Sequence, residues 1–397
     1  MTQSQSQQAT ETGQTPPKSP YLLDLGREAQ LSMKMLFEHA AAIEASDLLI
    51  TSGSPPIVRV DGDLHSVLEI PLKSVMTKKL IWSLLNETQQ EMFERKRELD
   101  FSLAVTGDLR FRANVYYQKG SVAAAFRLIP RKIPSMEELG LPKVVKELTL
   151  RPNGLILMTG PTGSGKSTSQ ASMIDLINQT RRCHVVTIED PIEFIHESKK
   201  CVIDQREVYA DTLSFANALK YVLRQDPDVI LVGEMRDMET IAAALTAAET
   251  GHLVIATLHT NDAVQSIDRI IDVFPPHQHE QIRVQLAFCL LGVVSQQLLL
   301  RKGQKGRILA TEILVKNSAV ANHIREGKTH QTRSIMEGAR REGMMTMDQR
   351  LKELYEADLI PFEELVRRIS NPSFLRQIDP RPDVEQDRLP QARGRQN

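Results

Sequence analysis

Residues 160–167 read Gly160-Pro161-Thr162-Gly163-Ser164-Gly165-Lys166-Ser167, a match to the spacing G-x-x-x-x-G-K-[ST]. The apolar run 155–158 precedes this stretch, and a helix-compatible segment, 168–177, follows it. Glycines let successive backbone N–H groups turn toward one anion, Lys166 adds a positive charge, and the Ser167 hydroxyl is a ligand for Mg²⁺. A glycine-rich turn with a chance lysine is the alternative, and the position between a strand and a helix argues against it. The sequence therefore predicts a nucleotide-binding loop from Gly160 to Thr168.

Apolar runs on both sides of this loop indicate the surrounding fold. Residues 154–159, 185–188, 229–232 and 253–258 predict strands that alternate with helices, as in a mostly parallel sheet. The expected fold class is α/β for residues 137–377.

The N-terminal part has a different pattern. A helix-like opening up to Ala45 is followed by short alternating runs punctuated by glycine and proline, which predicts a small α+β domain over residues 21–129. Two prolines mark residues 130–136 as a linker, and the polar compositions of residues 1–20 and 378–397 predict disordered tails.

Composition excludes several classes of protein. The chain has 397 residues, and its 49 Lys and Arg nearly cancel its 50 Asp and Glu, so no nucleic-acid partner is expected. The longest apolar run, 286–294, is well short of the roughly 20 residues that span a bilayer, and the N-terminus has no signal-like pattern. We expect a cytoplasmic protein whose three widely spaced cysteines are reduced thiols.

Two acidic positions follow predicted strands. Glu234 ends the run Asp228-Val-Ile-Leu-Val-Gly-Glu and is the candidate that organises Mg²⁺ at the strand's carboxyl end, although such a pattern alone is often just a strand end. Glu189, Asp190 and Glu193 lie close together after another strand, where like charges repel unless a cation is near. A carboxylate there can orient and deprotonate a water molecule, and a solvated acidic turn is the alternative.

His252 and His259 bracket the strand predicted over residues 253–258 and therefore lie at its opposite ends. They cannot share one zinc ion. Each is either a structural histidine or, beside a phosphate site, a sensor of the γ-phosphate.

Taken together, these motifs resemble the Walker A, Asp box, Walker B and His box of the secretion ATPase superfamily, and within it the type IV pilus retraction ATPases, the PilT family. The matching stretches are Gly160–Thr168, Thr187-Ile-Glu-Asp-Pro-Ile-Glu193, Asp228–Glu234 and the segment from Thr250-Gly-His252 to Asn261-Asp262. The resemblance covers about residues 45–369.

The resemblance implies a RecA-like P-loop ATPase domain preceded by a PAS-like domain, in a homohexamer that uses ATP and Mg²⁺. It assigns Glu193 as the catalytic glutamate and Glu234 as the Walker B acid. Ser167 and Glu234 are then the residues on the metal side of the site. It makes His252 and His259 the His-box pair. Arg110, Arg112 and Arg127 match N-domain arginines that reach the phosphates when a site closes. The resemblance implies two partners besides the other subunits. One is an inner-membrane pilus platform protein, which the chain contacts at the cytoplasmic face and which is its only link to the membrane. The other is a paralogous retraction ATPase.

The function implied is a motor that powers pilus retraction and twitching motility. Two departures leave alternatives open. The family's helix A-I-R-N-L-I-R-E appears as Ala319-Val-Ala-Asn-His-Ile-Arg-Glu326, and the usual Ser-Asp-Leu-His appears as Ser46-Asp-Leu-Leu49. The alternatives are an accessory retraction paralogue, a pilus-extension or type II secretion ATPase, and a nucleotide-binding assembly protein without turnover.

Overall fold

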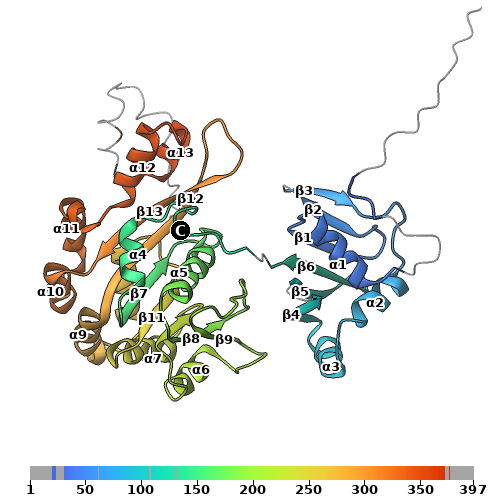
Figure 1. Ribbon diagram of the computed structural model, residues 1–397, viewed down its shortest axis with the longest axis horizontal. Helices are drawn as coiled ribbons and strands as arrows, with labels where there is room; N and C mark the ends of the chain where they lie inside the picture. The colour runs from blue at the N-terminus through green and yellow to red at the C-terminus, as the bar shows by residue number, and fades with distance from the viewer. Residues whose placement is uncertain are drawn as a thin grey trace, which may run out of the picture. The chain divides into compact units, whose positions relative to one another are not determined.

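The structure is a computed structural model that describes residues 20–23, 31–60, 62–106, 109–129, 132–371 and 375. Internal contacts divide the chain into two units, Met1–Ile129 and Pro130–Asn397, each of which is described by itself (Figure 1). The predicted disordered tails, 1–20 and 378–397, lie outside the described residues except for Pro20.

The first unit is an antiparallel sheet with helices against it. Its described strands lie in the order β3-β2-β1-β6-β5-β4. The strands are β1 (Asp47–Ile50), β2 (Ile57–Val60), β3 (Asp63–Ser66), β4 (Glu98–Thr106), β5 (Leu109–Gln118) and β6 (Ser121–Leu128). The helices are α1 (Met33–Ala42), α2 (Ser74–Trp82) and α3 (Glu87–Lys96).

Strict alternation along β5 separates the two faces of this sheet. Phe111, Ala113 and Val115 are buried and belong to the core that the helices cover, where the Phe37 ring of α1 lies 4.4 Å from the Phe111 ring. Arg110 and Arg112 alternate with these residues and therefore project from the opposite face. The register pairs Arg112 with Arg127 of β6, which places these arginines side by side on that face.

The second unit is built around a mixed, mainly parallel sheet whose described strands lie in the order β13-β12-β7-β11-β10-β8-β9. Its strands are β7 (Gly154–Thr159), β8 (His184–Glu189), β9 (Val202–Glu207), β10 (Val229–Val232), β11 (Leu253–Leu258), β12 (Leu290–Leu300) and β13 (Arg307–Val315). Its α-helices are α4 (Lys143–Thr149), α5 (Lys166–Thr180), α6 (Phe215–Val222), α7 (Met238–Glu249), α8 (Ala263–Asp272), α9 (His279–Cys289), α10 (Ser318–Glu326), α11 (Thr332–Gly338), α12 (Met347–Glu356) and α13 (Phe362–Arg368). Short 3₁₀ turns cover Pro276–Gln278, Thr329–Gln331 and Arg340–Glu342.

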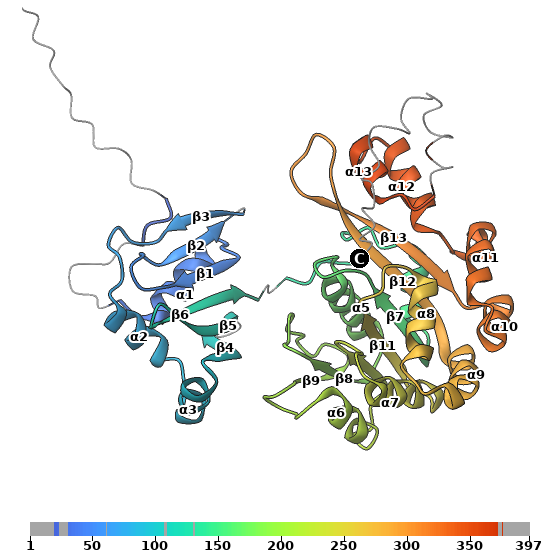
Figure 2. The same ribbon diagram turned by 180° about the vertical axis from the view of Figure 1, so that it is seen from behind.

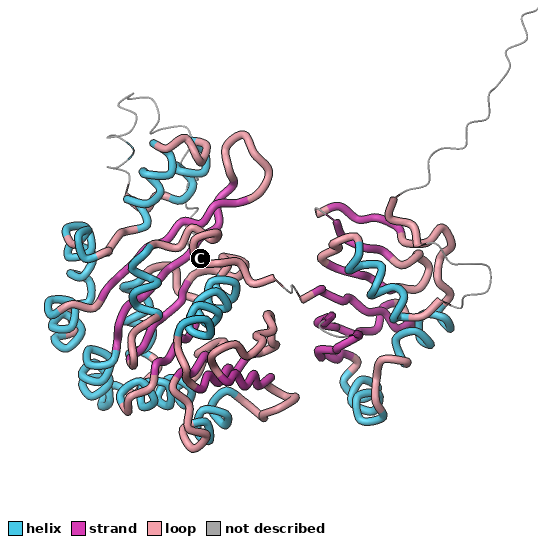
Figure 3. The backbone as a smooth tube through the Cα atoms, in the orientation of Figure 1, coloured by secondary structure: helices cyan, strands magenta, loops and turns pink. Residues whose placement is uncertain are grey.

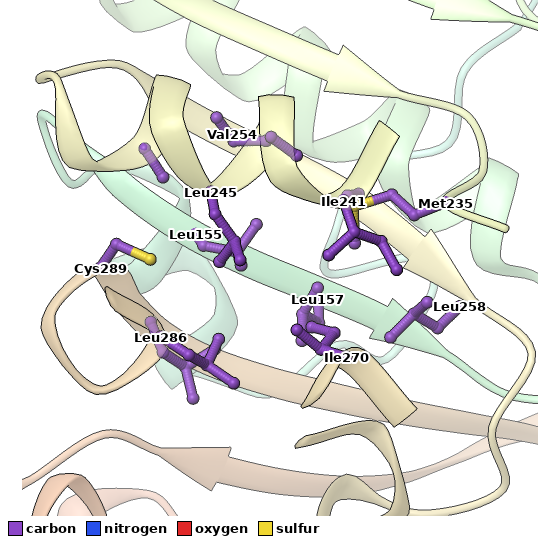
Figure 4. Close-up of a cluster of buried hydrophobic side chains, with 14 of the residues drawn as sticks. Leu155, Leu157, Met235, Ile241, Leu245, Val254, Leu258, Ile270, Leu286 and Cys289 are labelled. Carbon is purple, nitrogen blue, oxygen red and sulfur yellow. The ribbon is translucent and has the colours of Figure 1, made fainter. Parts of the chain in front are cut away.

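Helices cover both faces of this sheet, as Figures 1 and 2 show from opposite sides. Because side chains alternate along β7, Leu155 and Leu157 pack toward α7, α8 and α9, whereas Ile156 and Met158 pack toward α4 and α5. Figure 4 shows the first of these clusters, with Leu155 and Leu157 among the side chains of Leu245, Val254 and Leu286. Burial on both faces explains why these strands read as continuous apolar runs in the sequence.

The sequence predictions for this unit are largely confirmed. The four predicted strands are present, and the predicted helix begins at Lys166 and ends at Thr180. The apolar run 286–294 is divided between the end of α9 and the start of β12. Figure 3 shows how helices and strands alternate along this part of the chain.

Parallel pairing brings the carboxyl ends of four strands to one edge of the sheet. Thr159 pairs with Leu258, and Val232 pairs with both Ala256 and Ile188. The segments that follow β7, β11, β10 and β8 therefore leave the sheet at the same edge, where ligands bind in open α/β sheets.

No helix among the described residues is both long and apolar enough to cross a membrane.

Candidate active site

The phosphate loop joins β7 to α5 at this edge. Gly160, Gly163 and Gly165 have φ angles of +134°, +78° and +90°, a region that residues with a side chain rarely adopt. A Cβ atom at Gly160 would also collide with the carbonyl oxygen of Gln296 on β12. Gly165 precedes the first turn of α5 without a side-chain cap, so that turn offers its N–H groups to a bound anion.

Lys166 is folded into the loop it belongs to. Its Nζ donates hydrogen bonds to the carbonyl oxygens of Gly160, at 2.7 Å, and Pro161, at 3.0 Å. Burial lowers the pKa of Lys166, and the charges of Glu234 and Glu193 partly offset this effect. Both acids therefore lie within electrostatic reach of the lysine.

Glu234 follows β10 and carries two basic partners. Its Oε1 accepts from His259 Nε2 at 3.1 Å and from Arg236 Nε. Burial opposes ionisation of Glu234, but the hydrogen bond from Arg236 and the charge of His259 outweigh it, so the pKa of this carboxyl is lowered. Glu234 is thus held as a carboxylate, the form that ligates a divalent cation.

Glu193 lies in the connection between β8 and β9, and its side chain is exposed. A small cavity of about 60 Å³ adjoins it, lined by Ser167, Gln170, Ala171, Glu189, Asp190, Pro191, Glu193, Phe194, His196, Leu231 and Gly233. The cavity lies between the β8–β9 connection and Ser167 at the start of α5. Glu193 and Ser167 are therefore neighbours across it.

Glu189, at the end of β8, is a half-buried acid of this group. Burial raises the pKa of Glu189 to about 7, although Thr187 Oγ1 donates to its Oε1 at 2.7 Å. Sequence reasoning grouped Glu189 with its acidic neighbours and did not assign it a role. Burial of its side chain depends on the connection folding back over β8, for which the sequence contains no local signal.

A second hollow, of about 440 Å³, borders the other side of the first turn of α5. It is lined by Glu137, Glu138, Leu139, Gly140, Gly165, Thr168, Ser169, Leu298, Arg301, Arg307, Ile308, Leu309 and Arg350.

The residues at this edge fit a nucleotide with a divalent cation. The loop supplies N–H groups and Lys166 for phosphate oxygens, and Ser167 and Glu234 supply the hydroxyl and carboxylate oxygens that Mg²⁺ prefers. Among the described residues there is no cluster of three or more His, Cys, Asp and Glu side chains that would hold a metal ion without such phosphates.

The other predicted site residues lie elsewhere. His252 precedes β11 at the opposite edge of the sheet, where its Nδ1 lies 2.9 Å from the carbonyl oxygen of Ala247. Arg110, Arg112 and Arg127 belong to the first unit, where Arg127 Nε donates to Asp47 Oδ1 at 2.9 Å. The roles predicted for these four residues stay predictions.

Arg236 is a partner of Glu234 that sequence reasoning missed. The only local signal is its position two residues after the acid, in Gly233-Glu-Met-Arg236.

Comparisons with known proteins agree with this geometry. Residues 24–358 match the family described as Type II/IV secretion system protein. The chain is 49% identical over 328 residues to the type IV pilus retractation ATPase PilT of Pseudomonas aeruginosa, covering 83% of this chain and 95% of that protein. It is 46% identical over 335 residues to a twitching motility protein of Neisseria gonorrhoeae, covering 83% and 90% of the two chains. A crystal structure of the pilus retraction motor PilT with bound ADP has 49% identity and a TM-score of 0.82, covering 88% of this chain and 100% of that one.

Proposed function

The chain belongs to the type II/IV secretion system protein family, and we propose that it is an ATPase that powers the retraction of type IV pili. The observation that carries this proposal is the similarity to a pilus retraction ATPase over nearly the whole of that protein's length. The site supports it, because Glu193 and Glu234 both lie within electrostatic reach of Lys166 beside a phosphate loop.

ATP is the proposed substrate. Its phosphates bind the N–H groups of the loop, and Lys166 exchanges its bonds to the loop carbonyls for bonds to phosphate oxygens. Mg²⁺, when bound, neutralises charge on those oxygens, and Ser167 and Glu234 are the residues that would hold it. His259, whose Nε2 lies 3.1 Å from Glu234 Oε1, is the proposed sensor of the γ-phosphate.

Hydrolysis requires a group that orients water. Glu193 is the proposed base, since its carboxylate is exposed at the same edge and can accept a proton from the attacking water. Lys166 stabilises the charge that develops on the transferred phosphoryl group.

We further propose that the second unit is RecA-like and the first PAS-like, and that the chain acts as a homohexamer. In that arrangement the face of Arg110, Arg112 and Arg127 completes a site on closure, and rotation of the units during each ATP cycle does mechanical work. His252 belongs to the proposed His-box pair. Its proposed role is exerted at the edge of the sheet opposite to the one that carries Glu234.

The proposed setting is the cytoplasmic face of the inner membrane, where the ring contacts a pilus platform protein. A paralogous retraction ATPase is a proposed second partner, and the near balance of charges gives no reason to propose nucleic acid.

Deletion of the gene in its host, followed by imaging of pili, tests the direction of the motor. Excess, non-retracting fibres support retraction, whereas absent fibres indicate an extension or secretion ATPase. A partial defect that a second retraction ATPase compensates indicates an accessory paralogue. Steady-state hydrolysis of ATP by the purified chain separates all of these from a binding protein without turnover.

A further inference from the structure

The connection between β8 and β9, residues 190–201, carries Glu193 and packs against β9. Glu193 itself is weakly anchored, because the bond from its backbone N–H to Glu189 Oε2 is 3.5 Å long. The place of its carboxylate therefore depends on how the neighbouring residues of the connection are held.

Gln205 of β9 makes the bonds that hold the segment directly after Glu193. Its Oε1 accepts from the backbone N–H of His196 at 2.8 Å, and its Nε2 donates to the carbonyl oxygen of Phe194, also at 2.8 Å. The same Nε2 lies 3.3 Å from Glu189 Oε1. One amide thus ties the connection to β9 and to Glu189, the half-buried acid at the end of β8.

Glu207, two residues further along β9, contacts the segment on the other side of Glu193. Its Oε2 accepts from the backbone N–H of Ile192 at 3.2 Å. Residues two apart in a strand project to the same face, so Gln205 and Glu207 both face the connection. Glu207 binds residue 192, and Gln205 binds residues 194 and 196. Glu193 lies between these attachment points.

The far part of the connection has its own support. Asn178 of α5 donates to the carbonyl oxygen of Glu197 at 2.7 Å and accepts from the N–H of Lys199 at 2.9 Å. Ser198 Oγ accepts from the N–H of Ile203 at 3.2 Å. Loss of Gln205 would consequently release the segment directly after Glu193, and Ile192 and the far part of the connection would stay attached.

We propose that Gln205 is a positioning residue for ATP hydrolysis, which holds the Glu193 carboxylate where it can reach the attacking water. This inference rests on the proposed function. Small displacements of a catalytic group lower turnover strongly, whereas nucleotide binding depends on the separate loop between β7 and α5.

Two variants test it in the full chain. Gln205→Ala removes all three bonds, and Gln205→Glu keeps the shape and the acceptor for His196 but cannot donate to Phe194. We expect kcat to fall about ten- to a hundredfold in Gln205→Ala, with the Kd for ATP within about threefold of wild type. Gln205→Glu is expected to lose turnover as well, and its conserved shape keeps the test valid where the alanine variant does not fold.

Ser198→Ala is the matched control, because it removes one side-chain bond between the same connection and the same strand at a point away from Glu193. It is expected to retain wild-type kcat. The second measurement repeats Gln205→Ala in a Glu193→Gln background. Since Gln205 acts through Glu193, its replacement should lower the residual rate by less than about twofold there.

Wild-type kcat in both Gln205 variants would overturn the inference. So would an equal fold-loss in the wild-type and Glu193→Gln backgrounds, or a fall in kcat after Ser198→Ala as large as that after Gln205→Ala. A wild-type chain that binds ATP and does not hydrolyse it would instead contradict the proposed function, and the inference would fail with it.

Discussion

The Nζ atom of Lys166 lies 2.7 Å from the carbonyl oxygen of Gly160, so the cation of the phosphate loop is bound by the loop itself. A phosphate that enters the loop competes with this carbonyl for the same ammonium group. Lys166 is therefore positioned before nucleotide arrives, and its removal should leave the fold intact.

Lys166→Ala should abolish ATP hydrolysis and leave the thermal unfolding temperature near that of wild type. The lost cation contacts phosphates and loop carbonyls, whereas the apolar core does not depend on it. Steady-state ATPase assays and a thermal melt measure both effects, with Lys143→Ala, an exposed lysine of the same unit, as the control. Retention of more than about a tenth of wild-type kcat, a loss under roughly 1.4 kcal/mol, would contradict the role of Lys166.

Glu193→Gln and Glu234→Gln should differ in their response to Mg²⁺. Glu193→Gln keeps the shape of the proposed base and removes its basicity, so it should bind ATP and hydrolyse it very slowly. Glu234→Gln removes a proposed metal ligand and the partner of His259, so it should require more Mg²⁺ for half-maximal rate. Titration of Mg²⁺ against rate distinguishes them. Identical profiles with equally poor nucleotide binding would show that the two roles are misassigned.

Glu189→Gln should change how stability depends on pH. Burial raises the pKa of Glu189 from 4.5 to about 7, so the folded chain holds a proton that the unfolded chain has released. This contribution to the free energy of unfolding is fully present below about pH 4.5 and is lost as the pH rises through about 7, a change of roughly 3 kcal/mol.

Glutamine has no charge to bury and removes this dependence. Urea unfolding without nucleotide or Mg²⁺ should show a variant that is more stable than wild type at pH 8 and close to it at pH 5. An equal difference between the two chains at both pH values would mean that Glu189 ionises as freely in the folded chain as in the unfolded one.

Thiol labelling tests the packing around the cysteines. Cys183 precedes β8 and Cys201 precedes β9, and their Sγ atoms lie 3.4 Å apart although the sequence separates them widely. Burial raises the pKa of Cys183 and of Cys289 to about 12. Compared with an ordinary thiol of pKa about 9, each should carry about a thousandfold less thiolate at pH 8.

Site-resolved alkylation by iodoacetamide at pH 8 should therefore be slow in the folded chain and fast after denaturation. The rate at Cys183 in the folded chain should rise with pH up to the point of unfolding. If Cys183 and Cys289 were labelled as fast in the folded chain as in the denatured chain, the packing described around these two thiols would be wrong.

The sequence was sufficient for the elements that are buried on both faces. The runs at β7, β8, β10 and β11 are continuous and apolar because helices cover them on each side, and the phosphate loop fixes the order of strand, loop and helix. β9 has no such pattern. Its sequence, Val202-Ile-Asp-Gln-Arg-Glu207, is mostly polar because it is an edge strand whose side chains bind the connection that carries Glu193.

Contacts between distant segments could not be predicted from local patterns. The spacing placed Glu234 at a strand end, but its bond to His259 depends on the pairing of β10 with β11. The hydrogen bond to Glu189 likewise comes from Gln205, which lies on a different strand. Tertiary contacts of this kind set pKa values and positions, and residue type alone does not.

The last prediction concerns Arg112, which projects from β5 on the face opposite the core and lies beside Arg127 of β6. In the proposed closed site this guanidinium reaches the phosphates only near the transition state. Arg112→Ala should then bind ATP almost normally and lose turnover, because the lost interaction is stronger in that state than in the open one. Arg95→Ala, an exposed arginine on α3 of the same unit, is the control and should retain wild-type kcat. A surface arginine without a catalytic role changes stability by no more than roughly 0.5 kcal/mol and leaves kcat unaltered. An unaltered kcat for Arg112→Ala, in an assembly of the same size as wild type, would therefore refute the proposed role.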